Sequence, residues 1–202
     1  MNKKEFIDIV AEEAICGYEK YNILPSLVIA QAVLESNWGK SHIANNIFGI
    51  KAGSSWKGKI STRKTKEWNG KKYVVKEQNF RAYDSFQESI KDYLKLIGES
   101  KRYERVKEAA NYNEACKTVY ESGYATDPKY SEKLVKIIEE NRFYEYDLKV
   151  KEISKWAFEA WLWAEKNGIT DGKDPKKFAT REQAATMLFR LHNIYKGDKN
   201  GK

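Results

Sequence analysis

The carboxylate Glu35 lies at the end of an apolar segment and is the side chain best placed to do acid–base chemistry. The stretch 27–34 contains almost no polar side chain, and a helix that is apolar on every side is a buried one. We therefore expect Glu35 to emerge from the core beside Trp38, where desolvation raises the pKa of its carboxyl group. A carboxyl group that stays protonated near neutral pH is the general acid that a glycosidase needs. The alternative is a structural Glu paired with a Lys or Arg, because ion pairs also perturb pKa values.

The helix that carries this carboxylate has clear sequence limits. Pro25 suits a first helical position because its φ is fixed, and Gly39 provides a stop. An Asn-Gly pair at 69–70 stands between two strand-like runs, 59–68 and 71–80, and predicts a hairpin with a type I′ turn. Periodicity and capping residues predict further helices at 4–20, 85–97, 102–110, 112–121 and 127–141.

The chain has 202 residues and a net charge of +8, enough for one medium domain and a small one. Positive charge is concentrated toward the C-terminus, where residues 148–202 carry 12 Lys and Arg against 7 Asp and Glu. A basic surface suits an anionic partner, such as nucleic acid, an anionic membrane or an acidic wall polymer. The sequence has no long Lys/Arg run and no nucleic-acid module, so we do not expect a nucleic-acid partner. It also has no run of 18 apolar residues that would span a membrane.

No metal or other cofactor is expected. Cys16 and Cys116 are far apart and lack metal-ligand spacing, and His42 and His192 are equally distant from each other. We interpret both cysteines as small, buried hydrophobic residues. A disulfide or a catalytic thiol is the alternative.

The sequence pattern restarts at residue 148, which predicts a second unit over residues 148–202. Ser154 and Thr180 are expected to cap two helices, which end near Asn167 and Tyr195. Three of the six tryptophans crowd the first of these helices: Trp156, Trp161 and Trp163. A unit of about 50 residues cannot bury so much apolar surface alone. We expect it to pack on the first domain or on a copy of itself.

Several ordered motifs resemble one known family. Residues 34–41, 45–51, 80–85, 88–93 and 124–130 resemble, in this order, motifs of the endo-β-N-acetylglucosaminidase domain of glycoside hydrolase family 73. The first segment reads Leu-Glu-Ser-Asn-Trp-Gly-Lys-Ser, and the last reads Tyr-Ala-Thr-Asp-Pro with a second Tyr two positions later. The resemblance implies an α+β, mainly helical, lysozyme-like fold for a domain of residues 1–147. It also implies a small β-hairpin lobe, with a glycan groove between this lobe and the helices.

The resemblance further implies roles for individual residues. The general acid of the family falls on Glu35, and its second carboxylate falls on Glu67 in the hairpin segment Thr65-Lys66-Glu67. Glu77 on the returning strand is the alternative, because a one-residue slip in register turns every side chain to the other face. Tyr124 matches a family tyrosine near the acid; a loop tyrosine that packs on the next helix is the alternative. The residues implied to bind sugars are Asn46, Phe48, Lys51, Trp68 and Tyr130, with Trp38 and Trp56 as further stacking or core residues.

Residues 156–183 resemble an S-layer homology motif, a module that binds secondary wall polymers of Gram-positive bacteria. The resemblance places Trp156 and Arg181 in the polymer site, and a guanidinium at a helix N-terminus suits an anion. Such motifs usually occur in threes, whereas this chain has one copy. The resemblance implies a small helical wall-binding module over residues 148–202, in which self-association to a homo-oligomer would supply further copies. A helical appendage packed on the first domain is the alternative.

Together these features predict a peptidoglycan hydrolase without a cofactor, whose partners are glycan strands and an anionic wall polymer. It is expected to cleave the β-1,4 bond between N-acetylglucosamine and N-acetylmuramic acid and to leave N-acetylglucosamine as the new reducing end. Either Glu67 activates water with inversion, or the 2-acetamido group of the substrate attacks first. A lytic transglycosylase, which needs no second carboxylate, and a wall-binding protein without turnover are the alternatives.

The N-terminal residues 1–8 have no apolar core or cleavage site of a secretory signal. The expected context is a phage endolysin that lyses Gram-positive cells. Such a protein accumulates in the host cytoplasm and reaches the cell wall through a membrane lesion. A secreted autolysin trimmed of its signal is the alternative context.

Overall fold

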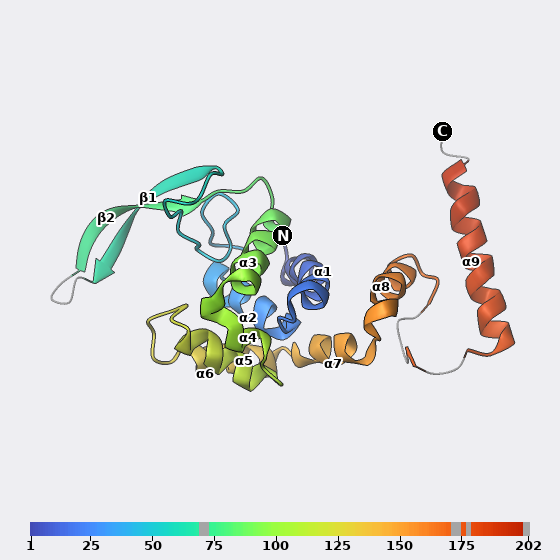
Figure 1. The fold of residues 1–202 in the computed structure, drawn as a ribbon. Helices are drawn as coiled ribbons and strands as arrows, with labels where there is room; N and C mark the ends of the chain where they lie inside the picture. Colours follow the sequence, from blue (N-terminus) through green and yellow to red (C-terminus); the bar gives the residue numbers. More distant parts are fainter. Residues whose placement is uncertain (69–72, 171–174, 177–178, 200–202) are drawn as a thin grey trace. The chain divides into compact units, whose positions relative to one another are not determined.

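The computed structural model describes residues 1–68, 73–170, 175–176 and 179–199. The chain divides into two compact units, Met1–Asp147 and Leu148–Lys202, and each is considered by itself. Figure 1 shows helices and one hairpin in the first unit, so the α+β, mainly helical architecture is confirmed. Its helices are α1 (Lys3–Tyr21), α2 (Pro25–Ser36), α3 (Phe86–Glu99), the short 3-10 helix η1 (Lys101–Tyr103), α4 (Glu104–Lys107), α5 (Tyr112–Glu121) and α6 (Tyr130–Glu140); α7 (Tyr144–Glu152) crosses the boundary.

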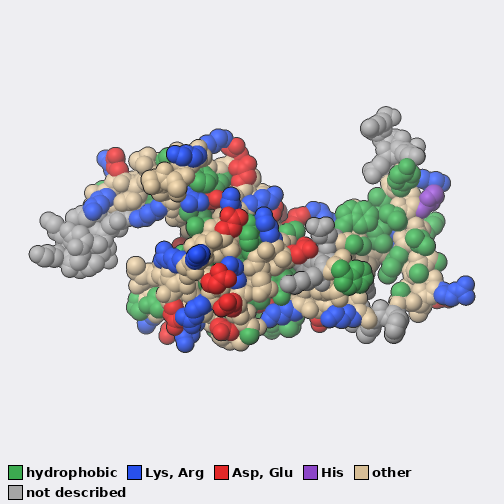
Figure 2. Space-filling model, viewed as in Figure 1, with side chains coloured by type: hydrophobic (Ala, Val, Ile, Leu, Met, Phe, Trp, Pro, Cys, Tyr) green, Lys and Arg blue, Asp and Glu red, His purple; other side chains and the backbone are tan. Residues whose placement is uncertain are grey.

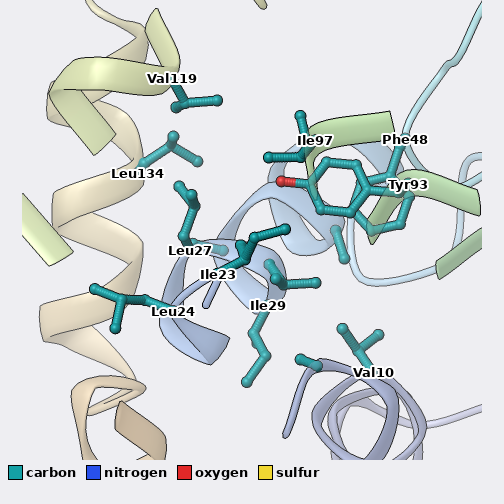
Figure 3. Close-up of a cluster of buried hydrophobic side chains, with 14 of the residues drawn as sticks. Val10, Ile23, Leu24, Leu27, Ile29, Phe48, Tyr93, Ile97, Val119 and Leu134 are labelled. Carbon is teal, nitrogen blue, oxygen red and sulfur yellow. The ribbon is translucent and has the colours of Figure 1, made fainter. Parts of the chain in front are cut away.

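Helix α2 is the centre of the first unit and packs against α1, α5 and α6. Every residue from Pro25 to Val33 is buried. Figure 3 shows Leu27 and Ile29 among side chains that come from these neighbouring helices, including Val10 and Leu134. The helix has no side-chain N-cap within its own sequence, so its stability comes from removing apolar surface from water on all sides.

The N-terminus of α2 is held by a carboxylate from the end of the first unit. The backbone N–H and the hydroxyl of Ser26 donate to Oδ1 and Oδ2 of Asp147 at 2.9 and 2.6 Å. Both residues are buried, with exposed fractions of 0% and 5%. Asp147 therefore accepts from a helix-terminal N–H group that Leu24, the N-cap residue, leaves without a side-chain partner.

The C-terminus of α2 lies at Ser36, three residues before the Gly39 predicted to stop it. Asn37 and Trp38 already have left-handed backbone conformations, with φ of 47° and 61°. The Ser36 hydroxyl accepts from the backbone N–H of Gly39 at 2.8 Å, which closes the turn. Glu35 therefore lies in the last turn of the helix.

The hairpin consists of β1 (Ile60–Trp68) and β2 (Tyr73–Arg81), close to the two predicted strands. The strands pair antiparallel, and the last pair is Trp68 with Tyr73. Four residues therefore separate the paired positions, whereas a type I′ turn at Asn69-Gly70 would leave two, so the observed pairing does not fit the predicted turn. The turn itself lies outside the described residues.

The base of the hairpin is tied to α3 by polar contacts. The guanidinium of Arg81 forms a 2.7 Å ion pair with Asp92, and the hydroxyl of Tyr83 donates to the same carboxylate oxygen at 2.7 Å. Phe80 is buried at this end of β2. These contacts fix the direction in which the hairpin leaves the helices in Figure 1.

Two further predictions for the first unit need correction. Helix α6 begins at Tyr130 and not at Asp127, because the Asp127 carboxylate accepts from the N–H of Lys129 at 2.9 Å and forms a turn there. Cys116 is buried, and desolvation raises its pKa to about 12, whereas Cys16 is exposed on α1. Predicted burial is thus wrong for Cys16.

The second unit is helical in its described part, with the short 3-10 helix η2 (Lys155–Ala157), α8 (Phe158–Lys166) and α9 (Arg181–Lys199). The predicted capping box at Thr180 is confirmed: its hydroxyl accepts from the N–H of Gln183 at 3.1 Å, and the Gln183 amide oxygen accepts from the N–H of Thr180 at 2.8 Å. Large apolar side chains are exposed along α9 and appear as green patches in Figure 2: Leu188, Phe189, Leu191 and Tyr195. Packing on the first domain or on a second copy stays a prediction.

Within the described ranges, none of the helices combines the length and apolar character needed to cross a membrane.

Candidate active site

Glu35 has two carboxylate oxygens with different surroundings. The hydroxyl of Tyr130, the first residue of α6, donates to Oε1 at 2.7 Å. Oε2 has no hydrogen-bond partner in the part of the chain that the structure describes. One oxygen is therefore held by the protein, and the other is open to a ligand.

The pKa of Glu35 is raised above its ordinary value. Desolvation is the main cause, and the hydrogen bond from Tyr130 opposes it because that bond stabilises the carboxylate. The side chain is nevertheless exposed by surface area, so its removal from water is only partial. No Lys or Arg forms an ion pair with Glu35 among the described residues, so nothing there supports the structural-ion-pair alternative.

Buried polar groups continue from Tyr130 into the core. Nε2 of Gln31 donates to the Tyr130 oxygen at 2.9 Å, and the hydroxyl of Tyr93 donates to Oε1 of Gln31. Gln31 and Tyr93 are 0% exposed and Tyr130 is 4% exposed. The chain Tyr93–Gln31–Tyr130–Glu35 thus has every donor directed toward the carboxylate.

Aromatic rings enclose this chain. The rings of Phe48 and Tyr93 stack with centroids 4.0 Å apart, as Figure 3 shows. Tyr124 packs between Tyr93 and Tyr130, with centroids 6.2 and 6.0 Å away. Burial raises the pKa of all three tyrosines above the ordinary value, so their hydroxyl groups stay neutral donors.

The two tyrosines of the segment 124–130 meet the site in different ways. Tyr130, expected to bind sugar, contacts the acid directly. Tyr124, expected to line the site near the acid, stacks on the ring of Tyr130, and its hydroxyl donates to the backbone carbonyl of Phe48 at 3.3 Å. Tyr124 therefore lies in the wall of the site, and Tyr130 is the tyrosine that touches Glu35.

The loop residues implied to bind sugar differ in exposure. Asn46 is 2% exposed: its amide nitrogen donates to the carbonyls of Ile50 and Arg81, and its oxygen accepts from the N–H of Ile50. Its polar atoms are therefore engaged by backbone, and Phe48 is buried as well. Lys51 is exposed. A direct binding role stays a prediction for all three, and exposure favours Lys51.

The second carboxylate is only partly located. The backbone of Glu67 pairs with Val74, but the side chains of Glu67 and Trp68 lie outside the described residues. Residues of a strand alternate between the two faces of a hairpin, and positions 61 and 67 of β1 belong to the same alternating set. Ser61 of this set pairs with the buried Phe80. Glu77 belongs to the other set and is exposed, and the choice between Glu67 and Glu77 stays a prediction.

Two other tryptophans have partners within the first unit. Trp38 packs edge-on against Phe143, and Nζ of Lys3 lies 4.1 Å from its ring centroid. Trp56 lies under the guanidinium of Arg81 at 4.5 Å. Both arrangements agree with a packing role.

The wall-polymer residues of the second unit are both exposed. Trp156 has an exposed fraction of 90%, and Arg181 is the first residue of α9. Polymer binding by either residue stays a prediction.

Sequence reasoning missed Gln31 and Tyr93. The available signal was a single amide inside an apolar run, four positions before Glu35 and thus on the same helix face. Tyr93 belongs to a segment, 88–93, that also resembles a family motif, but the resemblance implied no role for its side chain.

The described residues contain no group of three or more His, Cys, Asp or Glu side chains arranged to hold a metal ion. The arrangement around Glu35 is instead suited to proton transfer, with a partly desolvated acid, a hydroxyl donor and one open oxygen.

A buried helix that ends in such a carboxylate beside a two-stranded hairpin defines a lysozyme-like glycoside hydrolase. A solved structure with this fold is the catalytic domain of the autolysin Auto from Listeria monocytogenes. It is similar with a TM-score of 0.63 and 35% sequence identity, over 72% of this chain and 87% of that one.

The family follows from the sequence match. The glucosaminidase model, described as mannosyl-glycoprotein endo-beta-N-acetylglucosaminidase, matches residues 11–143, and the chain belongs to this family, glycoside hydrolase family 73. It is 44% identical to the exo-glucosaminidase LytG of Bacillus subtilis over 150 residues, 70% of this chain and 52% of LytG. It is 35% identical to the peptidoglycan hydrolase FlgJ of Salmonella typhimurium over 147 residues, 69% of this chain and 46% of FlgJ. The chain thus spans about half the length of these curated relatives. The family match ends before residues 148–202, whose S-layer homology stays a prediction.

Proposed function

We propose that the first unit is the catalytic domain of a peptidoglycan hydrolase. It hydrolyses the β-1,4 bond between N-acetylglucosamine and N-acetylmuramic acid and leaves N-acetylglucosamine as the new reducing end. The observation that carries this proposal is the unequal pair of oxygens on Glu35, one held by Tyr130 and one open, on a carboxyl group whose pKa is raised. Membership in the glucosaminidase family and the printed names of LytG and FlgJ support it.

Glu35 acts as the general acid. Its proton passes to the glycosidic oxygen as the bond from that oxygen to the sugar C1 breaks, and the electron pair of this bond leaves with the departing sugar. Desolvation favours the protonated state before the step. Tyr130 then stabilises the carboxylate that the step leaves behind, because a hydrogen bond to a charged oxygen is stronger than one to a neutral oxygen.

The nucleophile comes from one of two sources. Glu67 acts as a base on water, or the 2-acetamido group of the substrate attacks C1 before water does. The position of Glu67 on β1, in the same alternating set as Ser61, is compatible with the first route. The anomer formed first distinguishes the two, because direct attack by water inverts C1 and acetamido participation retains its configuration.

The bond choice is tested by mass spectrometry of borohydride-reduced fragments from purified Gram-positive peptidoglycan. N-acetylglucosaminitol ends are expected. Reduced muramic acid ends would instead establish a muramidase, and anhydro-muramic ends a transglycosylase; either outcome contradicts the proposed bond. The length of the fragments separates exo-cleavage, as in the name of LytG, from endo-cleavage, as in the family description.

For the second unit we propose binding to an anionic wall polymer through Trp156 and Arg181, on the basis of their exposure and the S-layer resemblance. The test is sedimentation of the full chain with walls before and after removal of the polymer by hydrofluoric acid. Arg181→Gln is expected to weaken binding to untreated walls, whereas Lys196→Gln, an exposed charge loss on the same helix, is not. Equal binding to both wall preparations would contradict the proposal.

The biological context that we propose is an endolysin acting on Gram-positive cells. The purified chain added from outside is then expected to lower the turbidity of a Gram-positive suspension. Intact cells, in a sample where isolated walls are digested, would contradict this context and leave the hydrolase itself standing.

A further inference from the structure

Gln31 is a fully buried amide in the middle of the apolar helix α2. A buried amide costs free energy unless both of its polar groups are hydrogen-bonded. Its two partners are Tyr93 on α3 and Tyr130 on α6, so both ends of the amide are engaged. Packing alone would be served as well by a Leu or Met, which indicates that the amide has another role.

The amide gives the hydrogen-bond chain a direction. Its NH₂ group only donates and its carbonyl only accepts. Because Nε2 of Gln31 donates to the Tyr130 oxygen, the hydrogen of Tyr130 is directed to the neighbouring acceptor, Oε1 of Glu35. Tyr93 holds this orientation by donating to the Gln31 carbonyl. A flipped amide would present its carbonyl to Tyr130, and Tyr130 would then donate to Gln31 and not to Glu35.

We propose that Gln31 is a positioning residue for the acid: through Tyr130 it keeps the Glu35 proton on Oε2, the oxygen without a protein partner in the described structure. The inference rests on the proposed function, in which Glu35 protonates a glycan. The Oε2–H bond breaks, the proton goes to the glycosidic oxygen, and the electron pair stays on Oε2. Oε1 accepts from Tyr130 before and after the transfer, so the side chain need not rotate.

Few other groups titrate near Glu35. The described groups that face it are Tyr130 of α6, Tyr124 of the preceding loop and Tyr93 of α3, and burial keeps all three hydroxyls neutral. The side chain of Glu67 lies outside the described residues. A change in the titration of Glu35 therefore reports on the hydrogen-bond chain.

The experiment is a double-mutant cycle on the full chain with Gln31→Met and Tyr130→Phe, read by ¹³C NMR titration of the Glu35 carboxyl carbon. Glu35→Gln identifies that resonance. Gln31→Met is expected to raise the pKa of Glu35, although Gln31 does not touch it, because the Tyr130 hydroxyl becomes a weaker donor. In the Tyr130→Phe background the same substitution is expected to change nothing, since Gln31 acts only through Tyr130. Tyr93→Phe is expected to shift the pKa in the same direction and by less.

Turnover on peptidoglycan supplies the second readout. Gln31→Met is expected to lower kcat about fivefold to tenfold with KM unchanged. Thermal melts show whether each variant is folded, and Tyr93→Phe tests the chain if Gln31→Met unfolds. The role of Gln31 would be overturned if folded variants keep the Glu35 pKa and kcat of the unsubstituted protein, or if the effects of the two substitutions on the Glu35 pKa are additive. Hydrolysis by the unsubstituted protein would still support the proposed function in that case. If the Glu35 pKa shifts as expected but neither the unsubstituted protein nor any variant hydrolyses peptidoglycan, the proposed function would be overturned. The proposal that Gln31 positions the Glu35 proton would then still stand.

Discussion

The hydroxyl of Tyr130 donates to Oε1 of Glu35 at 2.7 Å across 95 residues of sequence. The contact joins the last turn of α2 to the first turn of α6, two helices that pack together in the core. Because both helices are anchored by buried apolar side chains, the position of the acid is set by the core and not by a loop.

Tyr130→Phe is expected to move the alkaline limb of the kcat–pH profile to higher pH. The lost hydrogen bond favours the carboxylate, so its removal raises the pKa of Glu35 further and extends the protonated range. The maximum kcat is expected to fall about tenfold or more, because the carboxylate formed in the step loses its donor. Tyr124→Phe is the matched control, because Tyr124 is a partly buried tyrosine of the same site whose hydroxyl donates to the Phe48 carbonyl. If Tyr124→Phe shifts the alkaline limb of the kcat–pH profile and Tyr130→Phe does not, Tyr124 is the tyrosine that acts on Glu35.

Glu35→Gln is expected to stabilise the fold in a pH-dependent way. The folded-state pKa of Glu35 is raised above the unfolded value near 4.5, so wild type has full stability below that value and loses some as pH rises through the folded pKa. The Tm difference between Glu35→Gln and wild type should therefore be absent at low pH and grow to a plateau at higher pH. Thermal melts across this range measure it, and a difference independent of pH would contradict the raised pKa.

Asp147→Ala is expected to lower the free energy of unfolding by about 3 kcal/mol, because Ser26 loses a buried charged acceptor at the start of α2. Urea denaturation provides the measurement. Glu145→Ala removes an exposed carboxylate of the same helix, α7, and should cost less than about 1 kcal/mol. Equal losses for the two variants would show that the Asp147 contacts do not anchor α2.

Asn46→Ala and Lys51→Ala are expected to separate structure from binding. Asn46→Ala removes three hydrogen bonds to backbone, two of them buried, and should destabilise the fold by about 2–3 kcal/mol. Lys51 is exposed, so its substitution should leave Tm in place and raise KM for soluble glycan fragments. Melts and steady-state kinetics on both variants decide the matter; an unchanged Tm for Asn46→Ala would restore a direct binding role.

Glu67→Gln is expected to reduce kcat, whereas Glu77→Gln, which lies in the opposite alternating set of the hairpin, should stay within about twofold of wild type. Turnover of folded variants on peptidoglycan measures both. Full activity of Glu67→Gln would favour attack by the substrate's own acetamido group. If only Glu77→Gln loses activity, Glu77 and not Glu67 is the second catalytic carboxylate.

Local sequence signals were sufficient for much of the first unit. Pro25 and the apolar run located α2 and the acid, because burial on all sides leaves a plain pattern. The end of the helix was misplaced because Asn37 and Trp38 leave the helical region before Gly39, which sequence alone favoured as the stop. The observed pairing of Trp68 with Tyr73 does not fit a two-residue turn at Asn69-Gly70, because the register of a hairpin depends on the loop length, which a dipeptide signal alone does not determine.

Contacts between distant elements were harder to predict. The choice between Tyr124 and Tyr130 depends on where α6 begins, and the turn at Asp127 delays that start. The role of Gln31 depends on two tyrosines from other helices, 62 and 99 residues away. No periodicity encodes such a chain, so it emerges only once α2, α3 and α6 are packed together.

The most direct test of the central claim is the turnover of folded Glu35→Gln on purified peptidoglycan, followed by the release of new reducing ends. Gln keeps the size of the side chain and can still accept from Tyr130, but it cannot supply the acidic proton. We expect kcat to fall by a factor of about a hundred to ten thousand with the fold intact. A folded Glu35→Gln protein that keeps activity within about tenfold of wild type would contradict the assignment of Glu35 as the general acid.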